Sequence, residues 1–410
     1  MCEGAWAAEV LGSVHANHSL RGLAGGGLGR LRVRAGQPPV VGRTFRLFAT
    51  LRFDLERAAQ SQRGSVFALW RKCSFRYRWF HRANEAPSER ALERVVTELP
   101  LSAVVPTIDR SASLARTLES LEQQQLLPSE LIVVDASQNS DTREMLIGFA
   151  QRIGGNASVR WLAANSAGAA AQRNQGVAES RQPSIWFFDD DVRFEPECLA
   201  RLWRVFDGDP LLGGVSAMIT NQHYQTPGLA SRWMFRLMAG GPSRSYAGRV
   251  IGPAVNLLPE DHDGLAEVVP VEWLNLTCTI YRRAAMPQPP FPDVFHGYSF
   301  MEDLALSLAV GSRWKLANAR TARIFHDSQP GAHKSDPGSL AEMVLVNRCY
   351  VMTQYLRRTK PRDYLRLLAW TAFMHLAALR SSDGRRSLGA RLRGELRGIQ
   401  KLRRSRARKQ

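Results

Sequence analysis

Residues 101–135 read "LSAVVPTIDRSASLARTLESLEQQQLLPSELIVVD", and this stretch decides the fold. It opens with a short apolar run that ends at Pro106, as a buried strand of a parallel sheet would. Leucines at helical spacing follow, and a second apolar run ends at Asp135. A strand, a helix and a second strand in this order predict a parallel βαβ unit.

The same alternation continues after Asp135. Helical patterns over 140–153, 166–180 and 196–206 alternate with strand patterns over 158–163 and 184–189. The resulting order, βαβαβαβα, predicts an α/β fold with a doubly wound, mostly parallel sheet. Ligands of such sheets bind beyond the carboxyl ends of the strands.

Acidic residues follow three of the predicted strands. Asp109 lies just beyond the first strand, Asp135 ends the second, and the run Asp189–Asp191 ends the fourth. Neighbouring carboxylates repel one another and are costly to bury without a partner, so the run fits either a solvated turn or a divalent-cation site. Acids at three strand ends favour the cation site. The chain lacks the glycine-rich GxGxxG and GxxxxGK[ST] phosphate loops, which suggests that a cation binds the phosphates instead.

Five motifs in order carry a family resemblance. They are "AVVPTIDR", "ELIVVDASQNSDT", "GAAAQRNQG", "FFDDDV" and "GYSFMEDLALSL", spread between about residues 99 and 331. Together they resemble a family-2 inverting glycosyltransferase with the nucleotide-sugar-binding GT-A fold. The resemblance implies a nucleoside-diphosphate sugar as donor and Mn²⁺ or Mg²⁺ as cofactor.

The resemblance also implies roles for individual residues on the donor side. The residues placed around the nucleotide sugar are Pro106, Thr107, Asp135, Arg173, Asn174 and Asp190. Within this set, Asp135 would bind the base and Arg173 the diphosphate or the base, unless Arg173 lies on the exposed face of its helix. The cation would be held by Asp189 and Asp191, with His326 completing the site. As alternatives, Asp135 would cap a helix and His326 would be structural.

On the acceptor side, the resemblance assigns Asp303 as the general base and Glu302 as its orienting neighbour. A first helical turn also favours acids through the helix dipole, which is the alternative for this pair. Ala305 and Ala309 stand where an acid and an arginine are common in the family, so the resemblance does not identify the acceptor.

Charge divides the 410 residues into three parts. Residues 1–97 carry 16 Lys/Arg and 7 Asp/Glu, and residues 380–410 carry 12 and 2, so the stretch between them has a net charge of −1 out of the total of +18. We predict a basic N-terminal extension at 1–97, a catalytic domain at 98–335 and a helical C-terminal region at 336–410. Five scattered cysteines argue against a disulfide framework.

The basic tail carries leucines at helical spacing among its arginines, at Leu388, Leu392, Leu396, Ile399 and Leu402. This pattern predicts a helix on an anionic membrane surface and makes nucleic acid an unlikely partner, although a solvated tail stays an alternative. No unbroken apolar run of bilayer-spanning length and no signal peptide is seen, so the predicted location is cytoplasmic, peripheral on the inner membrane.

These observations predict a metal-dependent enzyme that glycosylates a hydroxyl of a glycan or lipid-linked saccharide, in bacterial cell-surface polysaccharide synthesis. The alternative is a non-catalytic binding protein of the same fold whose basic ends hold nucleic acid or a protein partner.

Overall fold

The computed structural model describes residues 97–154, 157–328 and 336–407. The predicted N-terminal extension therefore lies outside the described residues, apart from its last position. The strands are β1 (Thr97–Thr107), β2 (Leu126–Asp135), β3 (Ser158–Ala163), β4 (Ser184–Phe188), β5 (Val192–Phe194), β6 (Leu212–Ile219), β7 (Val250–Ile251), β8 (Val255–Asn256), β9 (Val268–Pro270), β10 (Cys278–Arg282) and β11 (Lys315–His326). The α-helices are α3 (Ser111–Glu122), α4 (Asp141–Arg152), α5 (Ala169–Glu179), α6 (Cys198–Gly208), α7 (Leu229–Ala239), α8 (Glu302–Gly311), α9 (Pro337–Gln354), α10 (Pro361–Ala378) and α11 (Ser382–Ala407).

The predicted βα alternation is confirmed from β1 to α6, with one addition, the short strand β5 between β4 and α6. The strands form a nine-stranded sheet in the order β3-β2-β1-β4-β10-β6-β11-β5, with β9 also paired to β11. The pairings give β1, β2, β3, β4, β6 and β11 one direction, and β5, β9 and β10 the other. The prediction of an α/β fold with a mostly parallel sheet is therefore confirmed.

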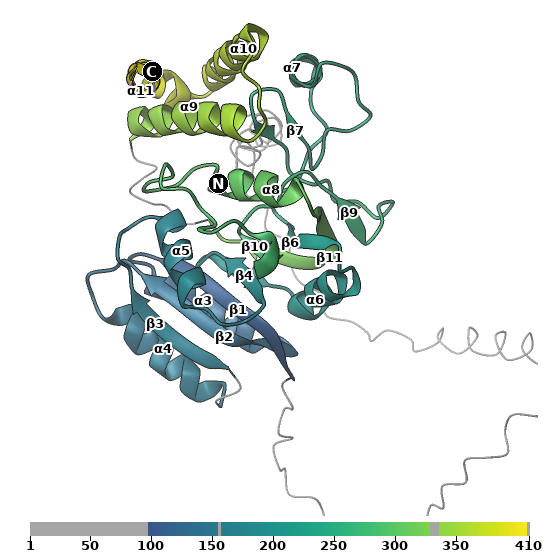
Figure 1. Ribbon diagram of the computed structural model, residues 1–410, viewed down its shortest axis with the longest axis vertical. Coiled ribbons are helices and arrows are strands. Elements are labelled where there is room, and N and C mark those ends of the chain that lie inside the picture. The colour runs from purple at the N-terminus through teal and green to yellow at the C-terminus, as the bar shows by residue number, and fades with distance from the viewer. Residues whose placement is uncertain (1–96, 155–156, 329–335, 408–410) are drawn as a thin grey trace, which may run out of the picture. The chain divides into compact units, whose positions relative to one another are not determined.

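Helices cover both faces of the sheet because successive side chains of a strand point to opposite faces. Ala103 and Val105 of β1 belong to a core shared with α3, α4 and α6. Val104, between them, belongs to a second core shared with α5, α8 and part of the C-terminal helices. Figure 1 shows this layered arrangement with the sheet at its centre. All three side chains are fully buried, which explains why β1 reads as a continuous apolar run.

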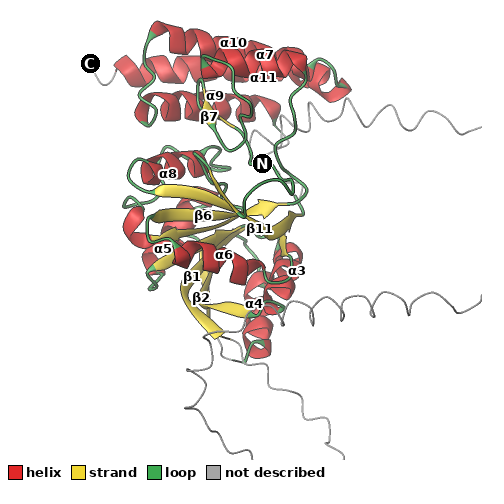
Figure 2. Cartoon of the chain, turned by 90° about the vertical axis from the view of Figure 1, so that its right-hand side faces the viewer, coloured by secondary structure: helices red, strands yellow, loops and turns green. Residues whose placement is uncertain are grey.

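The predicted helical C-terminal segment is present and forms a layer of its own with α7. Figure 2 shows α7, α9, α10 and α11 together at one end, with α8 between them and the sheet. A third, smaller core joins α7 and α10, in which the rings of Phe235 and Trp370 lie 6.2 Å apart. None of the helices in the described ranges is both long enough and apolar enough to cross a membrane.

Candidate active site

Polar side chains gather where β1 and β4 end. These strands pair in parallel, so their carboxyl ends lie side by side. Thr107 Oγ1 donates a 2.7 Å hydrogen bond to Asp190 Oδ2. Arg110 Nη1 lies 3.2 Å from Asp190 Oδ1 and 3.5 Å from Asp191 Oδ2. The run of aspartates is thus part of a buried polar cluster and not a solvated turn.

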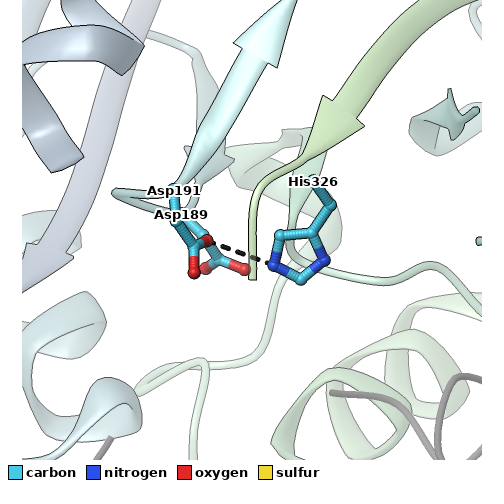
Figure 3. Close-up of side chains that lie close together, drawn as sticks. All are labelled: Asp189, Asp191 and His326. Atoms are coloured by element: carbon cyan, nitrogen blue, oxygen red, sulfur yellow. Dashed lines mark ion pairs between the residues drawn. The ribbon is translucent and has the colours of Figure 1, made fainter. Parts of the chain in front are cut away.

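A third segment brings a histidine to this cluster. β5 pairs with β11 so that His326 lies opposite Val192, which places the imidazole beside Asp191. His326 Nε2 is 3.1 Å from Asp191 Oδ1, as Figure 3 shows. Ligand atoms of Asp189, Asp191 and His326 all lie within 4.8 Å of one another. Two carboxylates and an imidazole suit Mn²⁺, and the carboxylates also suit Mg²⁺, so the three residues fit the predicted divalent cation.

The central aspartate of the run has an unusual protonation equilibrium. Burial, together with the negative charge of Asp191, raises the pKa of Asp190 to about 7. The hydrogen bond from Thr107 and the charge of Arg110 oppose this shift. A positive charge nearby would stabilise the ionised form of this carboxyl group, and a bound cation would supply such a charge.

The acidic pair opens α8, as predicted. Met301, the residue before the helix, has a left-handed backbone with φ 74°, and Glu302 and Asp303 occupy the first turn. Arg173, which is 4% exposed, reaches both acidic groups of the site. Its Nη1 lies 2.9 Å from Glu302 Oε1 and its Nη2 lies 2.7 Å from Asp189 Oδ1. One guanidinium therefore joins the candidate cation site to the acidic pair.

The two acids of this pair have different surroundings. Burial, followed by the negative charge of Asp303, raises the pKa of Glu302 to about 8, and Arg173 opposes the shift. Asp303 Oδ1 accepts a 2.7 Å hydrogen bond from the backbone N–H of Leu304. Glu302 is thus tied to the arginine, whereas Asp303 is oriented by its own helix.

The cluster lines a cavity of about 570 Å³, a size suited to a small ligand. Nine of the residues predicted for the site line it, namely Pro106, Thr107, Arg173, Asp189, Asp190, Asp191, Glu302, Asp303 and His326. They come from five separate parts of the sequence. The structure therefore brings together the donor-side and acceptor-side residues that the motifs predicted.

Two predicted residues lie outside the lining of this cavity. Asp135 is 2% exposed and accepts hydrogen bonds from Trp161 Nε1 at 3.1 Å and from the backbone N–H of Ser137 at 2.9 Å. Asn174 exchanges two hydrogen bonds with the backbone of Phe291, at 2.7 and 3.0 Å. Binding of the base by Asp135 and of the donor by Asn174 therefore stay predictions.

Two further residues in the cavity were not assigned from the sequence. Arg110 contacts Asp190 and Asp191, and it stands at the end of the quoted motif "AVVPTIDR". Gln172 is buried and donates to the backbone carbonyls of Thr107, at 2.9 Å, and Val134, at 2.8 Å. Gln172 precedes Arg173 in the third motif, so its position next to a predicted residue was the available signal.

The fold and the cavity define an α/β protein in which a cavity lined by acidic side chains lies at the carboxyl ends of parallel strands. Residues 102–240 match the family model described as glycosyl transferase family 2. This match confirms, for that segment, the family resemblance predicted from the motifs.

A similar curated protein is an uncharacterized glycosyltransferase of Haemophilus influenzae, 32% identical over 111 residues. The aligned stretch covers 27% of this chain and 35% of that protein, so the chain matches about a third of the relative's length.

Solved structures also show similarity to this chain. One is the mannosyltransferase PcManGT from Pyrobaculum calidifontis in complex with GDP-Man and Mn²⁺, with 14% identity, a TM-score of 0.44, and coverage of 79% of this chain and 84% of that one. Another is S. aureus TarS 1-349, with 17% identity, a TM-score of 0.40, and coverage of 65% and 68%.

Proposed function

We propose that this protein is an inverting, metal-dependent glycosyltransferase. It would move a sugar from a nucleoside-diphosphate sugar to a hydroxyl of a glycan or a lipid-linked saccharide, in the synthesis of a cell-surface polysaccharide. One observation carries the proposal: a candidate cation site and an acidic pair, far apart in the sequence, line the same cavity and share the guanidinium of Arg173.

The donor would lie at the ends of β1 and β4. Asp189, Asp191 and His326 are the residues that would hold Mn²⁺ or Mg²⁺. When bound, the cation would offset the negative charge of the nucleoside diphosphate. Arg110 lies beside the same carboxylates and supplies a fixed positive charge near the diphosphate.

The acceptor would enter beside the start of α8. Asp303 would take the proton of the acceptor hydroxyl as that oxygen bonds to the anomeric carbon. The bond between the anomeric carbon and the diphosphate oxygen breaks, and its electron pair leaves with the diphosphate. Attack from the face opposite the leaving group inverts the anomeric configuration.

Glu302 would act as a positioning residue. Its Oε1 is already bonded to Arg173, and a pKa raised to about 8 leaves the carboxyl group largely protonated near neutral pH, so little of it is free to accept a proton. Arg173, held between Glu302 and Asp189, would fix the distance between the proton acceptor and the donor site.

The test is a ligand screen followed by a turnover assay. Nucleoside diphosphates and nucleotide sugars, each with and without Mn²⁺ or Mg²⁺, are measured by thermal shift and calorimetry. We expect one nucleotide to raise the melting temperature only when the cation is present, and its sugar to be transferred or slowly hydrolysed. Glu119→Gln is the matched control, because Glu119 is an exposed carboxylate of α3 outside the cavity lining.

Two results would overturn the proposal. Metal-dependent nucleotide binding without transfer or hydrolysis would favour the non-catalytic binding protein. Absence of any cation-dependent nucleotide binding would remove the donor assignment itself.

A further inference from the structure

Large apolar side chains are exposed on three neighbouring helices, α7, α10 and α11. They form one stripe along each helix, at spacings of three, four or eight residues. The side chains are Leu229, Trp233 and Leu237 of α7, Leu365, Leu368 and Leu376 of α10, and Leu392, Leu396 and Ile399 of α11. We call them, with the arginines of these helices, the α7–α10–α11 surface. Trp233 is 68% exposed and Leu229 is 75% exposed, which is unusual for side chains of this size.

Contacts between the helices place α10 beside both α7 and α11. Phe235 of α7 packs on Trp370 of α10 with ring centroids 6.2 Å apart. His375 of α10 lies 2.9 Å from Glu395 of α11. Both figures show the three helices at the same end of the described fold, with α8 between this end and the sheet in Figure 2.

The C-terminal helix packs closely on α9 through two of its glycines. Gly394 of α11 packs so closely on Gly338 of α9 that a Cβ atom would fall on the Gly338 carbonyl oxygen. Gly398 also faces α9, but less tightly, since a Cβ there would lie 3.4 Å from the carbonyl oxygen of Glu342. The leucine stripe predicted from the sequence is therefore divided. Leu388 and Leu402 are partly buried, whereas the three apolar residues between them stay exposed.

The charge of these helices indicates what kind of partner the surface fits. Helices α7, α10 and α11 together carry 13 Lys/Arg and 3 Asp/Glu, a net charge of +10. The Arg236 guanidinium lies over the Trp233 ring at 5.5 Å, so an exposed aromatic ring and a cation share one site. Exposed leucines and a tryptophan bordered by arginines are typical of a surface that enters the headgroup region of a bilayer.

Charge repulsion argues against two other partners for this positively charged surface, namely the basic N-terminal extension and a second copy of the protein. Residues 1–97 carry a net charge of +9, and a second copy of this surface would bring another +10. An anionic bilayer instead attracts each basic residue near it by about 1 kcal/mol and accepts the apolar stripes.

The helical layer is bound to the acceptor side of the cavity. Asn347 of α9 donates a 2.8 Å hydrogen bond to the carbonyl of Phe300, which lines the cavity. Arg348, the next residue, is buried and bonds the carbonyls of Pro253 and Ala254 at 3.2 and 2.8 Å. A bilayer held by this layer would therefore have a fixed position relative to the site.

We propose that the α7–α10–α11 surface docks the protein on an anionic lipid bilayer, with α7 and α10 contributing as much as the basic tail. The proposal concerns a partner and does not require sugar transfer, so it is tested without donor. Its failure would leave the proposed reaction intact.

The experiment is co-sedimentation of the full chain with vesicles of phosphatidylcholine alone or with phosphatidylglycerol added, across a salt series. The variants are Trp233→Glu with Leu237→Glu on α7, and Leu365→Glu with Leu368→Glu on α10. Each pair replaces exposed apolar groups with negative charge, and we expect at least about a tenfold loss of partitioning into the anionic vesicles. Ile147→Glu is the matched control, since Ile147 is an exposed apolar residue of α4, a helix that packs on the core shared with α3 and α6 and not on the helical layer.

Circular dichroism and melting temperature establish that each variant is folded. If the folded α7 and α10 variants partition into the anionic vesicles as strongly as the parent protein, the proposal is wrong, whether or not the tail binds lipid by charge alone. Loss of self-association in the variants, with no vesicle binding by the parent, would assign the surface to a second copy. Competition of vesicle binding by nucleic acid at equal charge concentration would point to a purely electrostatic surface and also overturn the proposal.

Discussion

The strand-end cavity and the C-terminal helical layer are both rich in charge, but they place it in opposite surroundings. In the cavity, Asp190, Asp191 and Arg173 are almost fully buried and in contact with groups of opposite charge. In the helical layer most arginines are exposed, and the unusual feature is the exposed apolar stripe beside them.

This difference shows which residues are informative in each region. A buried carboxylate cluster is costly unless a ligand or a counter-charge completes it, so its presence indicates a site. Exposed arginines cost little, so they carry less information than the apolar side chains that stay in water. Variants that remove buried charge should therefore change ligand binding, whereas variants in the helical layer should change association and stability.

The largest effect is expected from Asp191→Asn. The variant removes one candidate cation ligand and the partner of His326, and it should abolish cation-dependent nucleotide binding. The fold should survive, because losing one negative charge relieves repulsion with Asp190. Calorimetry with the nucleotide and Mn²⁺ checks this, with Glu119→Gln as control. Parental binding by Asp191→Asn would show that the carboxylate cluster is not a cation site.

The next largest effect is expected from Asp303→Asn. If Asp303 takes the acceptor proton, turnover should fall by about 10²- to 10⁴-fold, while donor affinity changes little. Steady-state kinetics with donor and acceptor, together with calorimetry of the donor alone, separate the two effects. Turnover within a few-fold of the parent would reject Asp303 as the base and leave the cation assignment untouched.

Much of the sheet with its flanking helices was predictable from sequence because it depends on local patterns. Apolar runs gave the strands from β1 to β4, and parallel pairing then required their carboxyl ends to meet. The antiparallel insertion of β10 between β4 and β6 was not predictable, since it depends on pairing between segments far apart in the chain.

The site shows the same division. The resemblance predicted Asp189, Asp191 and His326 as cation ligands. It did not predict that Arg173 would bridge Asp189 and Glu302, because this depends on how α5, α8 and the end of β4 lie relative to one another. In the tail, the leucine pattern predicted a helix correctly. It did not reveal the close packing of Gly394 on α9, because glycine has no side chain that contributes to a hydrophobic pattern.

A moderate effect is expected from Gly394→Val in the helical layer. A side chain there meets the backbone of Gly338, which cannot move aside as a flexible side chain would. Overpacking of this kind costs about 1–3 kcal/mol, so the melting temperature should fall and α11 should become sensitive to protease. Nucleotide binding should be retained.

Gly389→Ala is the matched control for this variant on the same helix. The nearest atom to its Cβ would be Arg393 Nη1, at 3.8 Å, so there is room for the methyl group. Replacing glycine by alanine inside a helix should stabilise by about 0.5–1 kcal/mol. Equal destabilisation by both variants would contradict the close packing of α11 on α9.

A gradual effect, spread over several pH units, is expected in the pH dependence of stability, tested with Glu302→Gln. Burial, helped by the charge of Asp303, raises the pKa of Glu302 from its ordinary value of 4.5 to about 8. The folded state therefore holds this proton more tightly than the unfolded chain, and the free energy of unfolding should fall as the pH rises from 4.5 to 8. One group changes this free energy by no more than about 1.4 kcal/mol per pH unit. Glu302→Gln, which has no proton to lose, should show a shallower fall than the parent, measured by urea unfolding at several pH values.

Asp190, whose pKa is also raised, to about 7, stays in both proteins, so only the difference between them reports on Glu302. Glu342→Gln is the control, because Glu342 pairs with Arg397 at 2.9 Å in the helical layer and such solvent-accessible pairs contribute little. Identical slopes for Glu302→Gln and the parent would mean that Arg173 keeps Glu302 ionised, and Glu302 would then compete with Asp303 for the role of base.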